Sequence, residues 1–120
     1  MFPYQDPKKY IEERVEDLLQ RMTLEEKIMQ TDQHAAYYFA ENDTDGFVKE
    51  LHLEKLDELF HGHSVGSIQL RGCTAAQANE IQRYAVEKTR LGIPFLFSEE
   101  ALHGFMSKDA TCFPQQIGLA

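Results

Sequence analysis

The fold is decided by one stretch, which runs from Val65-Gly-Ser-Ile-Gln-Leu70 through Thr74-Ala-Ala-Gln77 to Leu91-Gly-Ile-Pro-Phe-Leu-Phe97. The segment 65–70 is short, apolar and bounded by glycines, which is typical of a buried strand. Thr74 and Gln77 form a capping box that predicts a helix over 75–90. Its expected core face consists of Ala78, Ile81, Ala85 and Val86. The apolar run 93–97 then predicts a strand covered on both faces in a parallel sheet.

This order of strand, helix and strand is that of a βαβ unit, whose crossover is expected to be right-handed. It predicts an α/β protein that is built either as a barrel or as an open sheet. A sheet of two parallel strands cannot cover its own edges. Because the run Gln115-Gln-Ile-Gly-Leu-Ala120 supplies no closing strand, we expect the neighbouring strands to lie downstream.

Residues 1–63 are predicted to form a helical lead-in. Asp6 followed by Pro7 is typical of a helix start. The helix should dock through an apolar stripe made of Ile11, Val15, Leu18, Leu19 and Met22. Thr23 with Glu26 forms a second capping box, which predicts a helix from residue 24 that directs Ile28 toward the same core.

Residues 34–46 are expected to form a loop that carries three neighbouring aromatic residues, Tyr37, Tyr38 and Phe39. These rings either stack on a sugar face or a partner, or pack under the helices. A helix is predicted over 47–60, ended by His61-Gly-His63, because apolar residues recur there at helical spacing. They are Leu51, Leu53, Leu56, Leu59 and Phe60.

Composition restricts the class of partner. Apolar residues make up 42% and charged residues 27% of the chain, as in ordinary globular domains. The formal net charge of -8 argues against nucleic acid, which requires a clustered basic face. No segment approaches the roughly 20 apolar residues of a membrane span, and residues 1–9 do not resemble a secretory signal. We therefore expect a soluble cytoplasmic protein with neither nucleic acid nor membrane as partner.

The residues that could bind metal or act as nucleophiles form no recognisable motif. His61-Gly-His63 lacks a third ligand at a typical spacing, so the sequence predicts no metal site. Cys73 and Cys112 lie far apart in the sequence and are expected to be buried free thiols. The absence of G-x-S-x-G, phosphate-loop and His-Glu-x-x-His motifs disfavours the corresponding hydrolases, nucleotide enzymes and zincins.

One dense polar cluster, Ser98-Glu-Glu-Ala-Leu-His-Gly104, follows the second predicted strand, where parallel α/β folds gather ligands. Glu99 and Glu100 are neighbours in an extended segment and should point to opposite faces. They cannot form a retaining catalytic pair, whose facing carboxyls lie roughly 5 Å apart. One of them is expected to accept sugar hydroxyls or simply be solvated, and the other to pair with a basic group. His103 is expected to be a buried imidazole that holds the loop through both ring nitrogens.

Three stretches, 14–28, 91–104 and 110–120, closely resemble the opening of family 3 glycoside hydrolases of the β-glucosidase and β-xylosidase type. The resemblance covers nearly the whole chain except the region around residues 34–50. It implies a TIM-like (β/α)₈ barrel, which needs around 250 residues. The 120 residues would then supply the first βα units: a helical lead-in (1–63), a βαβ unit (64–104) and the start of the next unit (105–120).

The resemblance also implies an activity and one site residue. Members of this family cleave β-linked sugars with retention, using an aspartate nucleophile and a separate acid/base and no cofactor. The motif of the nucleophile lies downstream in the family and nothing in this chain matches it, so no catalytic residue is assigned here. The acidic residue before Ala-Leu-His-Gly binds hydroxyls of the terminal sugar, and here it is Glu100. Aspartate is common at this position in glucosidases, and the longer glutamate would crowd an exocyclic CH₂OH, which favours β-xylosides and other pentosides.

The sequence leaves three functional interpretations open. The first is the amino-terminal part of a retaining exo-acting β-glycosidase, inactive alone, whose partners are a β-linked oligosaccharide and the remainder of the same barrel. The second is a non-catalytic α/β interaction module or a decayed remnant that packs against a partner chain. The third is a small metal or acid/base hydrolase built on His61, His63 and Glu100.

Overall fold

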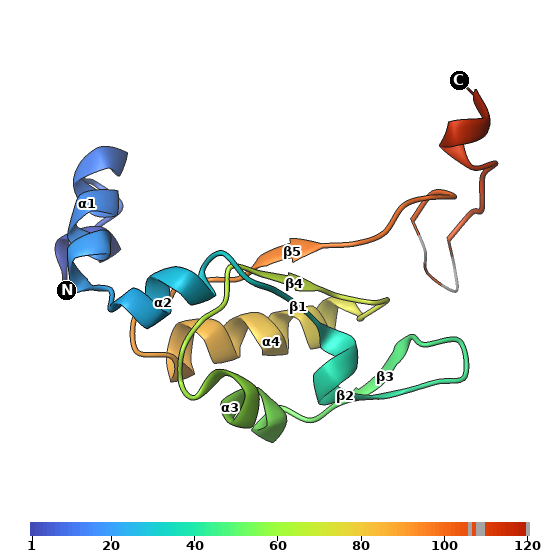
Figure 1. Ribbon diagram of the computed structural model, residues 1–120, viewed down its shortest axis with the longest axis horizontal. Coiled ribbons are helices and arrows are strands. Elements are labelled where there is room, and N and C mark those ends of the chain that lie inside the picture. Colours follow the sequence, from blue (N-terminus) through green and yellow to red (C-terminus); the bar gives the residue numbers. More distant parts are fainter. Residues whose placement is uncertain (106, 108–109, 120) are drawn as a thin grey trace.

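A computed structural model describes residues 1–105, 107 and 110–119 (Figure 1). Its elements are one parallel sheet, one antiparallel hairpin, four α-helices and three short 3-10 helices within these residues. In chain order they are η1 (Pro3–Gln5), α1 (Ile11–Arg21), α2 (Leu24–Met29), β1 (Gln33–Ala35), η2 (Ala36–Phe39), β2 (Ala40–Asn42), β3 (Val48–Leu51), α3 (Glu54–Phe60), β4 (Ser67–Gln69), α4 (Ala75–Lys88), β5 (Leu96–Ser98) and η3 (Gln116–Leu119).

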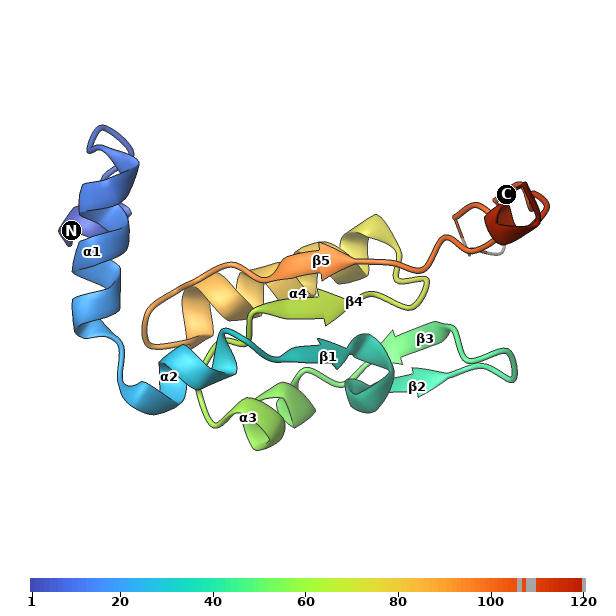
Figure 2. The same cartoon turned by 45° about the horizontal axis from the view of Figure 1, so that its top comes forward.

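The parallel sheet has the order β1-β4-β5, with β4 in the middle (Figure 2). In its register, Gln69 of β4 lies beside Ser98 of β5 on one side and Ala35 of β1 on the other. The unit β4-α4-β5 is the predicted βαβ unit. Thr74 accepts a hydrogen bond from the backbone of Gln77, so the predicted capping box of α4 is confirmed.

The core lies on the face of the sheet that α3 and α4 cover. Its members are Ala36, Phe39, Val48, Leu56, Phe60, Val65, Ile68, Ile81, Tyr84, Ala85 and Phe95. The assignment of Val86 to this core was wrong, because its side chain is 50% exposed. Tyr84 is buried instead, and its hydroxyl donates to Oδ1 of Asp57 on α3 at 2.6 Å. Ile81, Tyr84 and Ala85 lie three and four residues apart on one helix face, and Val86 is turned away from it.

The first strand of the sheet lies where a loop was expected. Residues 34–46 contain part of β1, then η2 and β2, and β1 pairs in parallel with β4. The range 1–63 therefore holds three strands as well as helices. Phe39 is fully buried, whereas Tyr37 and Tyr38 are exposed and meet edge to face with ring centroids 5.8 Å apart. Of the three aromatic rings, only that of Phe39 therefore packs under the helices, which was one of the two alternatives.

The predicted helix over 47–60 is wrong in its first half. Residues 48–51 form β3, which pairs with β2 in an antiparallel hairpin, and α3 occupies only Glu54–Phe60. The hairpin turn is closed by Asp43, whose Oδ1 accepts from the backbone N–H of Phe47 at 3.0 Å. Gly46 at the turn has φ +81°, a conformation that glycine adopts without a steric penalty. His61 and Gly62, both with positive φ, end α3 as predicted.

The amino-terminal helix starts later than expected, and its apolar stripe is only partly covered: Met22 is buried and Leu18 is half-buried, as predicted, but the other three residues are exposed. The carboxylate of Asp6 accepts from the backbone N–H of Lys8 at 2.9 Å, so it closes a turn, and α1 begins only at Ile11. Ile11, Val15 and Leu19 are between 48% and 70% exposed. The second capping box is confirmed, but Ile28 was assigned to the core wrongly, since it is 60% exposed.

The described part of the chain is extended for its length. Its Cα radius of gyration is 16.8 Å, against about 14 Å for a compact domain of 120 residues. Helix α1 projects at one end and the segment after β5 runs away from the other end (Figure 1). Leu96 of β5 is 74% exposed, and within the described residues β5 pairs only with β4, so its other edge has no partner. The strand that was predicted to be covered on both faces is therefore exposed on one face and unpaired at one edge, as expected for the first strands of an α/β barrel without the others.

Candidate functional site

The predicted polar cluster lies at the carboxyl edge of the parallel sheet. Strands β4 and β5 run in the same direction and end side by side at Gln69 and Ser98. Glu99 and Glu100 follow directly, so they stand at the edge where the turn after β4 also begins. Parallel α/β folds bind ligands at this edge because several chain segments meet there.

Glu99 ties the end of β5 to the turn after β4. Its Oε1 accepts from the backbone N–H of Gly72 at 2.7 Å. Gly72 has φ +75°, and a Cβ at this position would lie 2.5 Å from Cδ1 of Phe47, so a larger residue would not fit. The prediction that one of the two glutamates pairs with a basic group was wrong among the described residues, because Glu99 accepts from a backbone N–H and Glu100 from an amide. Burial, followed by the nearby Glu99 carboxylate, raises the pKa of the partly buried Cys73 thiol to about 12.

Glu100 lies on the other side of the segment and is exposed. Its Oε1 accepts from Nε2 of Gln69 at 3.2 Å, and its backbone N–H donates to Oε2 of Glu99 at 3.3 Å. The two carboxylates therefore contact different neighbours, Gly72 and Gln69. Their divergence agrees with the prediction from strand alternation that they do not act as a catalytic pair.

His103 holds its loop, but differently from the expectation. Its Nδ1 lies 3.1 Å from the carbonyl oxygen of Phe113, and the N–H of Phe113 donates to the His103 carbonyl at 2.7 Å. The prediction of a buried imidazole was wrong, since His103 is exposed and only one ring nitrogen has a contact within the described residues. Cys112, in the same segment, is exposed as well and is not the expected buried thiol.

A polar strip that sequence reasoning missed leads to Glu100. Gln33 of β1 donates through Nε2 to Oγ of Ser98 on β5 at 2.8 Å. Gln33, Gln69 and Ser98 lie on the sheet face opposite Ile68, which is buried in the core. The alternation in Ser67-Ile-Gln69 was the available signal, because period-two alternation of polar and apolar residues indicates one polar face.

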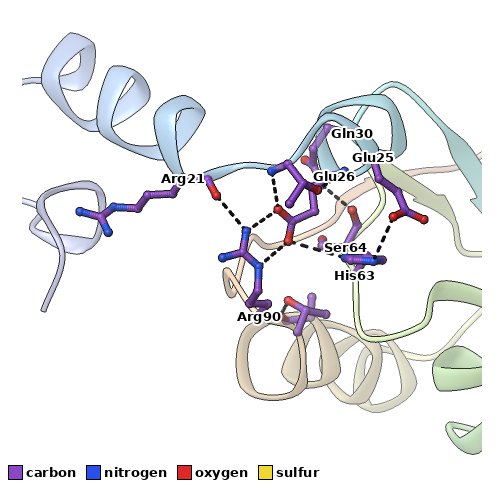
Figure 3. Close-up of polar contacts among 10 residues, drawn as sticks. Arg21, Glu25, Glu26, Gln30, His63, Ser64 and Arg90 are labelled. Carbon is purple, nitrogen blue, oxygen red and sulfur yellow. Dashed lines mark hydrogen bonds and ion pairs between the residues drawn. The ribbon is translucent and has the colours of Figure 1, made fainter.

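A second charged cluster lies at the opposite, amino edge of the strands (Figure 3). Glu26 of α2 is 4% exposed and accepts two hydrogen bonds from the guanidinium of Arg90, one of them from Nε at 2.8 Å. The N–H of Thr23 donates to it at 2.9 Å, and Nδ1 of His63 lies 3.6 Å away. These contacts, above all the one with Arg90, lower the pKa of Glu26 from 4.5 to about 2.

The amino-edge cluster has a structural role. Arg90 also donates to the carbonyl oxygen of Arg21 at 2.9 Å, so this one side chain joins the ends of α1 and α4 to α2. Residues at this end of a barrel serve stability, whereas ligands bind at the other end. His63 lies in this cluster and Glu100 at the carboxyl edge, so the structure does not bring these two residues of the third interpretation together.

The described residues contain no group of three or more His, Cys, Asp or Glu side chains arranged to hold a metal ion. Nor does any helix among them combine the length and apolar character needed to cross a bilayer.

A family profile, related sequences and solved structures all match this chain to the same family of glycosidases. The family profile described as "Glycosyl hydrolase family 3 N terminal domain" matches residues 23–120. "Probable beta-glucosidase C" of Aspergillus flavus is 34% identical over 98% of the chain, and "Putative beta-xylosidase" of Formosa agariphila is 34% identical over 95% of it. The crystal structure of a β-glucosidase from Listeria innocua covers 77% of the chain with a TM-score of 0.54 and 31% identity. The structure of the Listeria β-glucosidase in complex with glucose gives a TM-score of 0.51 at 27% identity.

The chain is much shorter than these relatives. It spans 20% of the Aspergillus protein, 16% of the Formosa protein and 13% of the Listeria chain.

Proposed function

The chain belongs to glycosyl hydrolase family 3, and from this premise we propose that it supplies part of the terminal-sugar subsite of a retaining, exo-acting β-glycosidase. The observation that carries the proposal is the position of Glu100. An exposed carboxylate stands at the carboxyl edge of the sheet, beside a polar strip and without a cationic partner among the described residues. A sugar ring, which is neutral and covered with hydroxyl donors, suits such a surface.

Glu100 would act by accepting two hydrogen bonds from neighbouring hydroxyls of the terminal sugar. A carboxylate has about four acceptor positions on its two oxygens, and among the described residues only Gln69 donates to this carboxylate. Hydrogen bonds to a charged acceptor are roughly twice as strong as neutral ones, so two of them fix the orientation of the ring. Fixing the ring places its anomeric carbon relative to the groups that carry out the chemistry.

The nucleophile and the acid/base would come from the remainder of the barrel. Glu99 and Glu100 diverge, and Glu99 is engaged with the backbone of Gly72. A retaining hydrolase requires a pair of facing carboxyls roughly 5 Å apart. We therefore expect the 120 residues alone to be inactive. The proposal also divides the chain into three segments of the barrel: a lead-in (1–63), a βαβ unit (64–104) and the start of a further unit (105–120).

For substrate preference we propose a β-xyloside or related pentoside over a β-glucoside. Glutamate reaches one methylene further than aspartate, so Glu100 would occupy space that an exocyclic CH₂OH requires. The names of the relatives include both a β-glucosidase and a β-xylosidase, so the family as such favours neither sugar.

The test compares two proteins, the 120-residue chain and the same chain extended through its downstream sequence, on p-nitrophenyl β-xyloside and β-glucoside. The proposal predicts activity in the extended protein only, with the xyloside preferred. In E100D the shorter side chain should shift the ratio of kcat/KM values toward the glucoside. Activity in the 120 residues alone would refute the catalytic assignment, and a glucoside preference in the unmodified protein would refute the role given to glutamate.

The interaction-module alternative rests on the uncovered apolar surface of α1 and on the open edge of β5. Both features equally suit contact with the remainder of a barrel. The same assay separates the two functions, because an interaction module or a decayed remnant would be inactive in the extended protein as well.

A further inference from the structure

We propose that Gln69 is a positioning residue, which orients the carboxylate of Glu100 toward the hydroxyls of the terminal sugar. This inference rests on the proposed function and deepens it. Gln69 is the last residue of β4. It was not selected from the sequence, because it lies outside the polar cluster 98–104 that follows β5.

The contact itself is specific in its atoms. Nε2 of Gln69 donates to Oε1 of Glu100 at 3.2 Å, across 31 residues of sequence. Within the described residues no hydrogen bond is formed by Oε2 of Glu100, so this oxygen stays available to a ligand. One oxygen is therefore held and the other is open, which restricts rotation of the carboxylate to an orientation that presents Oε2.

The sheet register explains why Gln69 is the side chain in reach. Gln69 lies directly beside Ser98, and Glu100 follows Ser98 by two residues. Side chains two residues apart in an extended chain share a face, so Gln69, Ser98 and Glu100 all belong to the polar face of the sheet. The core-facing Ile68, next to Gln69, is fully buried and fixes the strand that carries the amide.

Two further contacts make the support rigid. Gln33 donates to Ser98 at 2.8 Å, which ties β1 to β5 across β4. Glu99 accepts from Gly72 at 2.7 Å, which fixes the backbone that bears Glu100. The main chain of Glu100 is thus held by its neighbour, and its side chain by Gln69.

The chemistry of an amide suits this role better than a cation would. A lysine or arginine at this position would form an ion pair with Glu100 and compete with sugar hydroxyls for both oxygens. A glutamine donates one neutral hydrogen bond and leaves the negative charge of the carboxylate for the substrate. Its second amide hydrogen and its carbonyl oxygen are further groups that a hydroxyl could bind.

The test is a double-mutant cycle in the chain extended through its downstream sequence. Gln69→Glu keeps the size and shape of the side chain but removes the donor and places a second negative charge beside Glu100. Gln69→Ala is the second variant, in case the acidic one folds poorly. Each is combined with Glu100→Ala, and kcat/KM on p-nitrophenyl β-xyloside is measured together with the thermal unfolding midpoint.

We expect each Gln69 variant to lower kcat/KM about tenfold when Glu100 is present and less than twofold when residue 100 is alanine, because the loss of a hydrogen bond to a charged group acts only through that group. The matched control is Gln20→Glu, the same isosteric change at an exposed glutamine of α1. Its effect should be additive with Glu100→Ala.

Two results would overturn the positioning role. One is a Gln69→Glu protein with kcat/KM within twofold of the unmodified enzyme, and the other is an equal loss in both backgrounds, which would indicate a purely structural residue. A failure of the proposed function is recognised separately. In that case Glu100→Ala alone leaves kcat/KM unchanged, or the extended protein hydrolyses no glycoside.

Discussion

Replacing Arg90 tests the account of the amino-edge cluster. The change Arg90→Met keeps most of the aliphatic stem and removes the guanidinium that holds the buried carboxylate of Glu26. A hydrogen bond to a charged group contributes about 1.5–3 kcal/mol, and loss of one partner of a buried pair costs more. Arg90 is about half exposed, so solvent screening places the expected loss near the lower end, at about 2 kcal/mol.

The expected loss depends on pH in a defined direction. The pKa of Glu26 is lowered from 4.5 to about 2, so its ion pair stabilises the fold fully above pH 4.5, and this stability is lost as the pH falls toward 2. At pH 7 the thermal unfolding midpoint of the extended chain should therefore fall by about 4–8 °C, since 1 kcal/mol corresponds to about 2–4 °C in a domain of barrel size. Near pH 2 the variant and the unmodified protein should unfold at nearly the same temperature.

The assay is differential scanning calorimetry between pH 2 and 7, with Arg83→Met as the matched control. Arg83 is an exposed arginine on α4, the helix that ends just before Arg90, and it forms no ion pair with any other described residue. The reasoning is refuted if Arg90→Met and Arg83→Met unfold at the same temperature at pH 7. It is also refuted if the difference between Arg90→Met and the unmodified protein persists unchanged at pH 2.

Three further predictions concern local structure in the extended chain. Thr74→Ala removes the cap of α4 and should lower the free energy of unfolding by about 1 kcal/mol in urea denaturation; no change would contradict the capping contact. Cys112 should be alkylated by iodoacetamide at pH 8 long before Cys73, because a pKa of about 12 leaves only about one Cys73 side chain in ten thousand as the reactive thiolate. Equal alkylation rates by mass spectrometry would contradict the burial of Cys73. Gly66→Ala should cost about 3 kcal/mol, because its Cβ would lie 2.0 Å from the carbonyl oxygen of Gln30, and unchanged urea denaturation would contradict this packing.

The parts of the fold that could be predicted are those specified by neighbouring residues. Thr23 and Thr74, each with a partner three residues later, marked the starts of α2 and α4 correctly. The glycine-bounded apolar run 65–70 marked β4, whereas the run 93–97 overlaps β5 only at residues 96 and 97. In each case the signal and the structure lie within a few residues of each other, so no knowledge of tertiary contacts was required.

The parts that were missed depend on pairing between distant segments. Strand β1 is three residues long and contains Gln33 and His34, so it lacks an apolar run, and only its pairing with β4 makes it a strand. Val48 and Leu51 have a spacing that also fits a helix, and the hairpin with β2 decides between the two structures. Local propensity is a weak guide where sheet pairing determines the outcome.

The candidate site was predictable in position but not in its contacts. Glu100 could be selected because it follows a strand of a parallel sheet and precedes Ala-Leu-His-Gly. Its partner Gln69 and the backbone partner of Glu99, Gly72, follow from the register between β4 and β5, which the sequence does not specify. The exposure of His103 likewise depends on how the segment after β5 is placed.

The most direct test of the central claim is the effect of Glu100→Ala on the extended protein. The measurement is kcat/KM on p-nitrophenyl β-xyloside and β-glucoside at a temperature where both proteins are fully folded. Loss of two charge-assisted hydrogen bonds to the terminal sugar predicts a fall of at least about 100-fold on the preferred substrate. A value within twofold of the unmodified enzyme would contradict the assignment of this chain to the terminal-sugar subsite.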